Sequence, residues 1–195
     1  MTTSPTRLHP ETRARSRAEP GAGAPGGSAP RRQWRILGTP VGDMLIAGDD
    51  DAVRLIGLPS SFDPVSLDPA DAAADGSAAA VEEAGRQLAA YFDHRLRAFS
   101  LPLDPAGTDF QRRVWFALDD IGYGETESYG SLAARIGHKG ASRAVGAANG
   151  RNPLPIVLPC HRVIGADGSL TGYGGGVELK QLLLDHERSS ATGRP

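Results

Sequence analysis

The stretch 152–162 reads NPLPIVLPCHR and carries Cys160, the only cysteine in the 195-residue chain. An apolar run bounded by prolines predicts a buried, extended approach to the thiol. A single thiol beside His161, delivered by a rigid apolar segment, indicates a nucleophile held in a pocket. The alternative is an inert core cysteine, which is a frequent role of free cysteines. These two residues alone leave both interpretations open.

A single cysteine excludes an intramolecular disulfide and a zinc site built from several cysteines, although a histidine/carboxylate site stays open. We expect neither a metal nor a cofactor. No apolar run approaches the ~20 residues of a membrane span, and the N-terminus lacks the apolar core of a signal peptide. A reactive thiol also fits a reducing compartment. The sequence therefore predicts a cytoplasmic protein.

The net charge of −2 hides an uneven distribution of charge along the chain. Residues 1–32 carry six arginines against two acidic residues, whereas residues 33–127 carry seventeen acidic residues against seven arginines. Residues 128–180 are basic again, with six Lys and Arg against two acidic residues. A basic segment around the thiol favours a polyanionic partner, although a surplus of this size also fits ordinary surface scatter.

The N-terminal half predicts a small sheet with one helix. Residues 1–32 are rich in Pro, Gly, Ala, Ser and Arg and predict a disordered tail. Three short strands joined by tight turns predict an antiparallel meander, at residues 34–37, 44–47 and 53–58. Residues 59–77 predict a loop. A helix should follow at about 79–93, with a core-facing stripe of Val81, Leu88, Tyr91 and Phe92.

The C-terminal half predicts mostly helices, entered through an extended linker at residues 101–105. Thr108 or Asp109 can cap the first helix, whose buried side would carry Phe110, Val114, Trp115 and Leu118. Two short helices, at 129–136 and 141–149, flank the glycine-bearing turn 137–140 and form a helix-turn-helix candidate. The small residues of the second helix allow close approach to either a neighbouring helix or a nucleic-acid groove.

The segments after Cys160 predict the surroundings of the thiol. Residues 163–170 predict a small hairpin, and the glycine-rich loop 171–176 predicts a wall that faces the substrate. The last helix, about 177–188, should place Leu179, Leu182 and Leu183 inward and also carries Glu187.

The sequence Pro159-Cys160-His161-Arg162-Val163, preceded by Asn152-Pro153 and followed by Gly172-Tyr173-Gly174-Gly175-Gly176, resembles the active-site signature of the O6-alkylguanine-DNA alkyltransferases. The similarity covers about Thr108 to Glu187 and is looser over residues 33–103. It implies an α/β two-domain fold: an N-terminal antiparallel-sheet domain (33–103) and a mostly helical, winged-helix-like C-terminal domain with a helix-turn-helix (104–190). Residues 1–32 and 191–195 would be tails.

The resemblance also implies roles for individual residues. Cys160 would accept the alkyl group, His161 would be its base through a bridging water, and Glu187 would orient the histidine. Asn152 would brace the turn that carries the cysteine, and Tyr129 would contact both the guanine and a phosphate. Arg143 would enter the duplex where the nucleotide leaves. Other DNA contacts would come from Ser142, Ala144, Gly146, Asn149 and Arg151, and the pocket would be lined by Tyr173, Gly174, Val163 and Pro155.

The reaction that the resemblance implies is repair of O6-alkylguanine, and also of O4-alkylthymine, in flipped-out nucleotides. The thioether product is stable and the chain has no second thiol, so we expect one turnover per molecule. The partner would be double-stranded DNA, bound through its minor groove by a monomer. Many relatives carry serine where Gly174 stands, so here only a backbone N–H could reach the base oxygen.

Two other functions remain open. A non-catalytic lesion-binding protein of the alkyltransferase-like kind usually replaces the cysteine, so the intact Cys160-His161 pair disfavours it. A helix-turn-helix regulator would prefer a sequence in undamaged DNA. A papain-like hydrolase is poorly supported, because the chain lacks a Cys-Gly-Ser/Ala-Cys motif.

Overall fold

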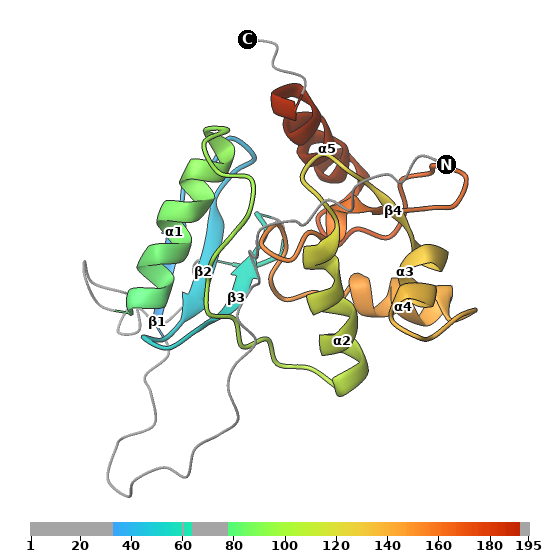
Figure 1. Ribbon diagram of the computed structural model, residues 1–195. Helices are drawn as coiled ribbons and strands as arrows, with labels where there is room; N and C mark the ends of the chain where they lie inside the picture. Colours follow the sequence, from blue (N-terminus) through green and yellow to red (C-terminus); the bar gives the residue numbers. More distant parts are fainter. Residues whose placement is uncertain (1–32, 60, 64–77, 192–195) are drawn as a thin grey trace, which may run out of the picture.

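The computed structural model describes residues 33–59, 61–63 and 78–191. The expected tail and most of the expected loop at 59–77 lie outside these residues. Two parts of different composition stand side by side (Figure 1): a sheet covered by one helix, and a larger, mostly helical part. This is the expected α/β two-domain fold. Among the described residues, no helix is both long and apolar enough to cross a bilayer.

The first part is an antiparallel sheet in the order β1-β2-β3 with α1 on one face. Its strands are β1 (Gln33–Leu37), β2 (Met44–Gly48) and β3 (Val53–Gly57), and α1 spans Ala79–Phe92. The predicted meander and helix are thus confirmed. Val81, Leu88 and Tyr91 on α1 are fully buried against the core, as the helical stripe predicts.

The helical part begins with α2 (Asp109–Ala117), capped by Thr108 in a capping box with Gln111. A 3-10 turn, η3 (Leu118–Asp120), then leads to β4 (Glu127–Ser128). The pair α3 (Tyr129–Arg135) and α4 (Ser142–Asn149) follows, and α2 packs against α4. The chain continues through the 3-10 helix η4 (Cys160–Arg162) and β5 (Val163–Ile164) to α5 (Val177–Ala191).

Two expectations about local structure are wrong. Residues 163–170 do not form a hairpin of paired strands, because Val163–Ile164 pairs in parallel with Glu127–Ser128. Leu182 on α5 is 58% exposed, whereas Leu183 and Leu184 are buried, so the helix presents a different face than expected. The linker 101–105 is extended as predicted, and within it Leu103 forms a parallel bridge with Val53.

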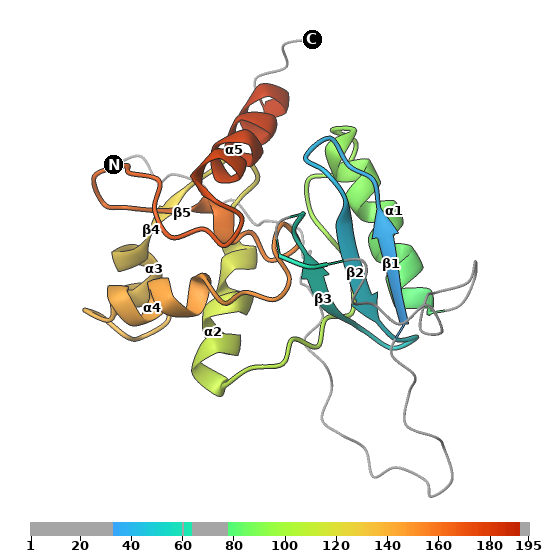
Figure 2. The same cartoon turned by 180° about the vertical axis from the view of Figure 1, so that it is seen from behind.

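The two parts meet along the outer edge of β3, the strand nearest the helical part in Figures 1 and 2. Val53 N donates to Pro102 O at 2.9 Å, and Asp104 N donates to Val53 O at 3.0 Å. Further along the strand, Ile56 N donates to Pro153 O at 2.8 Å. The turn that precedes Cys160 is therefore joined to the sheet through the main chain.

Candidate active site and nucleic-acid interface

The segment before Cys160 is buried as expected, but it is a closed turn and not an extended approach. Asn152 closes it: its Nδ2 donates to Leu158 O at 2.7 Å, and its Oδ1 accepts from Leu154 N at 3.0 Å. Leu158 N also donates to Leu154 O at 2.9 Å. Ile156 has a φ of +73°, a left-handed conformation that the surrounding contacts must stabilise. Asn152 therefore stands where the sequence predicts a brace.

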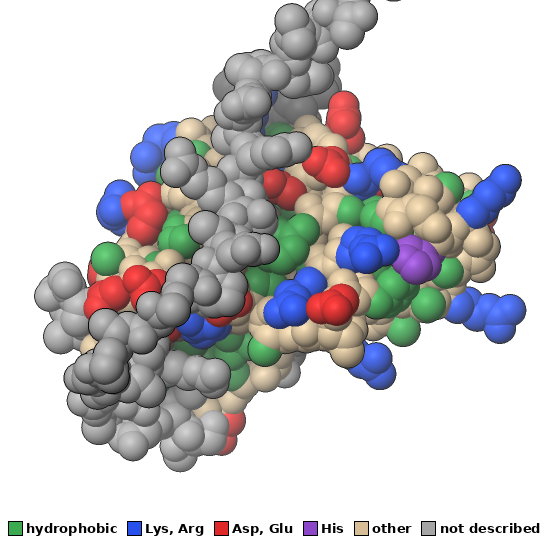
Figure 3. Space-filling model, turned by 60° about the horizontal axis from the view of Figure 1, so that its bottom comes forward, with side chains coloured by type: hydrophobic (Ala, Val, Ile, Leu, Met, Phe, Trp, Pro, Cys, Tyr) green, Lys and Arg blue, Asp and Glu red, His purple; other side chains and the backbone are tan. Residues whose placement is uncertain are grey.

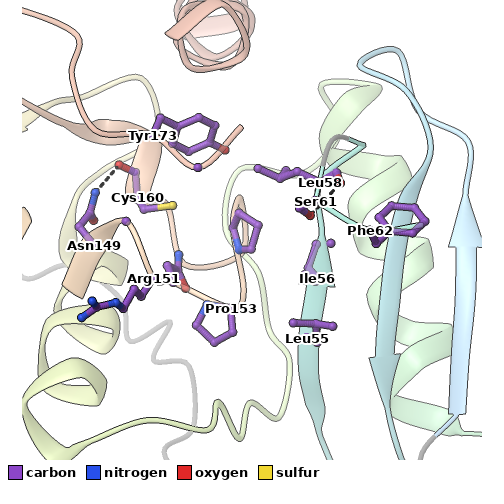
Figure 4. A pocket seen from close by; sticks show the side chains of 15 residues that line it. Leu55, Ile56, Leu58, Ser61, Phe62, Asn149, Arg151, Pro153, Cys160 and Tyr173 are labelled. Atoms are coloured by element: carbon purple, nitrogen blue, oxygen red, sulfur yellow. Dashed lines mark hydrogen bonds between the residues drawn. The ribbon is translucent and has the colours of Figure 1, made fainter. Parts of the chain in front are cut away.

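Cys160 opens the 3-10 helix η4, and its side chain lies in a cavity between the two parts of the molecule. The residue is only 4% exposed. The cavity has a volume of about 270 Å³ and includes Pro155, Tyr173 and Gly174 in its lining. Figure 4 shows the sulfur pointing into this space, with Tyr173 on one side and the residues of β3 and the following turn opposite. The sheet side of the wall is formed by Leu55, Ile56, Gly57, Leu58, Ser61 and Phe62.

Burial determines the protonation of the thiol. It raises the pKa of Cys160 to about 11, although the Asn152 amide and the charge of Lys180 act in the opposite direction. At neutral pH the sulfur is therefore a thiol in the free protein, and a nucleophilic thiolate requires a base nearby.

His161 is the nearest base in sequence, and it forms a buried pair with Glu187. His161 Nε2 lies 2.8 Å from Glu187 Oε1, and neither side chain is exposed. Because the carboxylate only accepts, Nε2 carries the proton and Nδ1 has the lone pair. Within the described residues Nδ1 has no hydrogen-bond partner. Burial lowers the pKa of His161, with only partial opposition from Glu187, so the ring is a neutral acceptor at pH 7.

Glu187 is held by more partners than the sequence indicates. Arg162 donates to both carboxylate oxygens at 2.9 Å, Gly124 N donates to Oε2 at 2.9 Å, and the Tyr91 hydroxyl donates to Oε1 at 2.9 Å. Burial alone would raise the pKa of Glu187, but the hydrogen bonds from His161 and Arg162 keep it well below its usual range. The carboxylate is therefore ionised. The sequence interpretation assigned no role to Tyr91 or Arg162.

Lys180 is a third group to which the sequence assigns no role. It is fully buried on α5, and its Nζ donates to Val163 O at 2.6 Å and to Thr171 O at 2.9 Å. Burial lowers its pKa, while the charge that Cys160 would carry raises it. A positive charge at this place stabilises a thiolate at Cys160. In the sequence it appeared only as part of the basic surplus.

A second, more open hollow of about 440 Å³ lies over the helix pair α3–α4. Tyr129, Ser142, Arg143 and Gly146 contribute to its lining, together with the loop residue Thr171. Ser142, Arg143 and Ala144 are exposed at the start of α4. The Tyr129 hydroxyl donates to Thr171 O at 2.9 Å, which connects this hollow to the glycine-rich loop.

The surface around the helix pair is suited to an anionic partner. Figure 3 shows Lys and Arg side chains gathered on the part of this face formed by α2, α3 and α4, while acidic side chains lie mainly toward the sheet. The exposed residues of α4 include Ala144 and Ala147, so the backbone of this helix can come close to a second surface. The other side of α4 packs against a neighbouring helix, α2, whose Trp115 Nε1 donates to Ala148 O at 2.7 Å.

Three predicted site residues lie elsewhere than expected. Asn149 is buried and does not face the exposed side of α4; its Nδ2 donates to Cys160 O at 3.2 Å, and it borders the thiol cavity. Arg151 borders the same cavity. Val163 is buried in β5 and is not among the residues that line the cavity. In the described residues, no three His, Cys, Asp or Glu side chains are grouped so that they could hold a metal ion.

The chain is similar in sequence and in structure to known proteins. A family model described as the DNA-binding domain of 6-O-methylguanine DNA methyltransferase matches residues 109–189. A methylated-DNA–protein-cysteine methyltransferase from Mycobacterium tuberculosis is 48% identical over 161 residues, which cover 81% of this chain and 93% of the relative. One from Methanosarcina acetivorans is 44% identical over 156 residues, covering 80% and 98%. A crystal structure of M. tuberculosis OGT in complex with DNA superposes with a TM-score of 0.71 at 45% identity, covering 81% and 94%.

Proposed function

The chain belongs to the methylated-DNA–protein-cysteine methyltransferases, and from this membership we propose that Cys160 itself takes the alkyl group from O6-alkylguanine in DNA. The general activity of the family is DNA repair by alkyl transfer to a protein cysteine. The observation that carries the proposal for this chain is the position of Cys160 at a base-sized cavity, beside a neutral histidine paired with an ionised carboxylate.

The chemistry is a displacement at a saturated carbon. The Cys160 sulfur forms a bond to the alkyl carbon as the carbon–O6 bond breaks, and the electron pair passes to the guanine ring. The thiol proton moves through a bridging water to His161 Nδ1, and the released guanine takes up a proton at its ring nitrogen. A soft thiolate is the best side-chain nucleophile for such a carbon. Glu187 stabilises the imidazolium, as the carboxylate does in a catalytic triad.

The target carbon is not accessible inside a base-paired duplex, so the nucleotide must be flipped into the cavity first. Extrusion costs a few kcal/mol, and less for a damaged, poorly paired base. We assign Arg143, exposed at the start of α4, to the gap that the base leaves, with α4 in the minor groove. Tyr129 would donate to the flipped base, and the backbone N–H of Gly174 would reach its O6 oxygen.

We further propose a domain boundary, a second substrate, a monomeric state and a single turnover for this protein. The domain boundary lies near residues 103 and 104, between the sheet part and the helical part. O4-alkylthymine is a second substrate, the protein acts as a monomer, and each molecule reacts once, because no second thiol can remove the alkyl group. The alkylated product is a thioether, which water does not hydrolyse under mild conditions.

Intact-mass spectrometry tests the proposal. Incubation with a duplex that contains O6-methylguanine should add one methyl group per protein molecule, on the peptide that contains Cys160. The variant Cys160→Ser should bind the same duplex and gain no mass. Retained binding without transfer by the natural chain would instead favour a lesion-binding protein, and repeated turnover would exclude a suicidal reaction.

A further inference from the structure

Tyr91 reaches the catalytic carboxylate from the other part of the molecule. It lies near the end of α1, which packs on the sheet, and its hydroxyl is 2.9 Å from Glu187 Oε1. The same oxygen accepts from His161 Nε2 at 2.8 Å. Of the partners of Glu187 described above, Gly124, His161 and Arg162 belong to the helical part. Tyr91 is the partner that the sheet part supplies.

The Tyr91 side chain is held on every side. Its ring packs edge-on against Phe92 and Tyr123, with centroid distances of 5.2 and 6.0 Å, and lies 5.0 Å from the His186 ring. His186 Nε2, in turn, lies 3.0 Å from the Tyr91 carbonyl oxygen and donates to it. Tyr91 and α5 are therefore joined at two points, through the hydroxyl and through the main chain. Turning the hydroxyl away would break the bond to Glu187 and disturb the contacts of the ring with its aromatic neighbours.

The hydroxyl is a permanent donor in this arrangement. Burial raises the pKa of Tyr91 well above its usual range, and the neighbouring charge of Glu187 raises it further. The phenol is therefore protonated at neutral pH, and its hydrogen points to an ionised oxygen. Hydrogen bonds of this kind, to a charged acceptor, are stronger than those between neutral groups.

We propose that Tyr91 is a positioning residue for alkyl transfer: it fixes Oε1 of Glu187 and moderates the basicity of His161. This inference rests on the proposed function, because it concerns the base of the same reaction. The sheet part then does more than form a wall of the cavity, since one of its side chains belongs to the hydrogen-bond chain Tyr91–Glu187–His161.

Tyr91 and His161 donate to the same oxygen of Glu187, and this determines the direction in which the pKa of His161 should change when Tyr91 is replaced. A donor on Oε1 withdraws negative charge that would otherwise stabilise the imidazolium of His161. Without the Tyr91 hydroxyl, the charge on Oε1 acts more fully on His161, so the pKa of His161 rises. The histidine then loses its neutral, proton-accepting form at a higher pH, and the acidic limb of the transfer rate moves upward in pH.

The variant Tyr91→Phe tests this with one atom removed and the ring kept. In single-turnover kinetics at saturating lesion duplex, we expect the limiting rate of transfer to fall about tenfold on the acidic side of the pH profile for each unit by which the limb moves upward, because the neutral fraction of His161 falls in that proportion. The affinity for the duplex should not change, because Tyr91 lies outside the hollow over α3–α4. The titration of His161, followed by nitrogen-15 NMR of the imidazole, should shift to higher pH.

Phe92→Leu is the matched control. Phe92 neighbours Tyr91 on α1 and contacts the Tyr91 and His186 rings, but it has no polar group. It should lower the unfolding temperature and leave the His161 titration and the acidic limb of the rate unchanged. If Tyr91→Phe does not fold, a difluorotyrosine at position 91 keeps the hydroxyl and makes it a stronger donor, and it should shift the His161 titration to lower pH.

An unchanged His161 titration in Tyr91→Phe overturns the inference, as does a shift of equal size in Phe92→Leu. The NMR readout does not depend on activity. If the natural chain gains no alkyl group but Tyr91→Phe still shifts His161, the proposed function fails and the coupling of Tyr91 to the histidine stands. If the natural chain gains an alkyl group and the His161 titration is unchanged in Tyr91→Phe, only the inference about Tyr91 fails.

Discussion

At the scale of single residues, the site depends on a buried charge pair as much as on the thiol. Glu187 is fully buried and Arg162 is only 7% exposed by its side chain, yet both are charged. Arg162 contributes two hydrogen bonds to the carboxylate and a third, at 2.5 Å, to Ile121 O. Arg162, the residue after His161, thus anchors the carboxylate that accepts a hydrogen bond from that histidine.

Replacement of Glu187 by glutamine should therefore be costly for stability. The variant Glu187→Gln leaves the Arg162 charge buried without its counter-charge, and breaking a buried pair in this way costs about 3–5 kcal/mol. Urea denaturation measures the loss. Glu178→Gln, an exposed change in the first turn of the same helix, should stay within about 0.5 kcal/mol of the natural chain. Equal stabilities for the two variants would contradict this account.

At the scale of elements, α4 is the part best suited to enter a nucleic-acid groove. Its buried side carries Val145, Ala148 and Asn149, and its exposed side includes Ala144 and Ala147. These two alanines are three residues apart, so they lie on the same face of the helix. If DNA contacted α4 only through charged side chains, larger residues in place of these alanines would be tolerated. If the helix backbone lies close to the DNA, they would not be.

The variant Ala147→Leu separates these two cases. We expect binding to the lesion duplex to weaken at least about tenfold, because the larger side chain keeps the helix from the groove, with little change in stability. Fluorescence anisotropy with labelled duplex measures the affinity. Ala79→Leu, exposed at the start of α1 on the sheet part, is the control that should leave binding unchanged. Unimpaired binding by Ala147→Leu would place the DNA elsewhere.

The sequence predicts most helices and strands well, because their signals are local. Thr108 with Gln111 determines the start of α2, and the stripe on α1 determines its buried face. The errors concern contacts between distant segments. The pairing of Val163–Ile164 with Glu127–Ser128 joins strands of two residues each, too short for a periodic signal. The left-handed Ile156 and the closed turn around Asn152 likewise depend on hydrogen bonds that no spacing shows.

The candidate site likewise contains residues whose role the sequence predicts and residues whose role it does not. The resemblance to a family implies roles for Cys160, His161 and Glu187; the structure pairs His161 with Glu187 and places Cys160 at the cavity. Tyr91 was interpreted only as a core residue, because an aromatic side chain on a buried stripe has the same pattern whether or not its hydroxyl has a partner. Lys180 was counted only as one more charge. Partners that come from distant elements require the folded chain.

At the scale of the whole molecule, stability should depend on pH through the thiol. The pKa of Cys160 rises from 9.0 to about 11 on folding, so the folded state keeps a proton that the unfolded chain loses above pH 9. The contribution of the protonated Cys160 thiol to the free energy of unfolding is complete below pH 9 and is lost as the pH rises to 11. The loss over this window is about 3 kcal/mol.

Denaturation curves of the natural chain and of Cys160→Ala between pH 8 and pH 11 measure this effect. Other groups titrate in the same range, but they are common to both proteins, so the difference between the two curves isolates the thiol. The free energy of unfolding of the natural chain should fall relative to that of Cys160→Ala as the pH rises. Parallel curves would mean that the thiol titrates in the folded protein as it does in the unfolded chain.

The covered outer edge of β3 has a consequence for the behaviour of the protein in concentrated solution. A strand with unpaired main-chain groups can recruit the strand of another molecule and begin aggregation. Here Pro102, Asp104 and Pro153 already occupy that edge, through bonds to Val53 and Ile56. Separation of the two parts would break the bond from Ile56 to Pro153 and expose that stretch of β3, so damage to their junction should appear as precipitation before it appears as loss of helix.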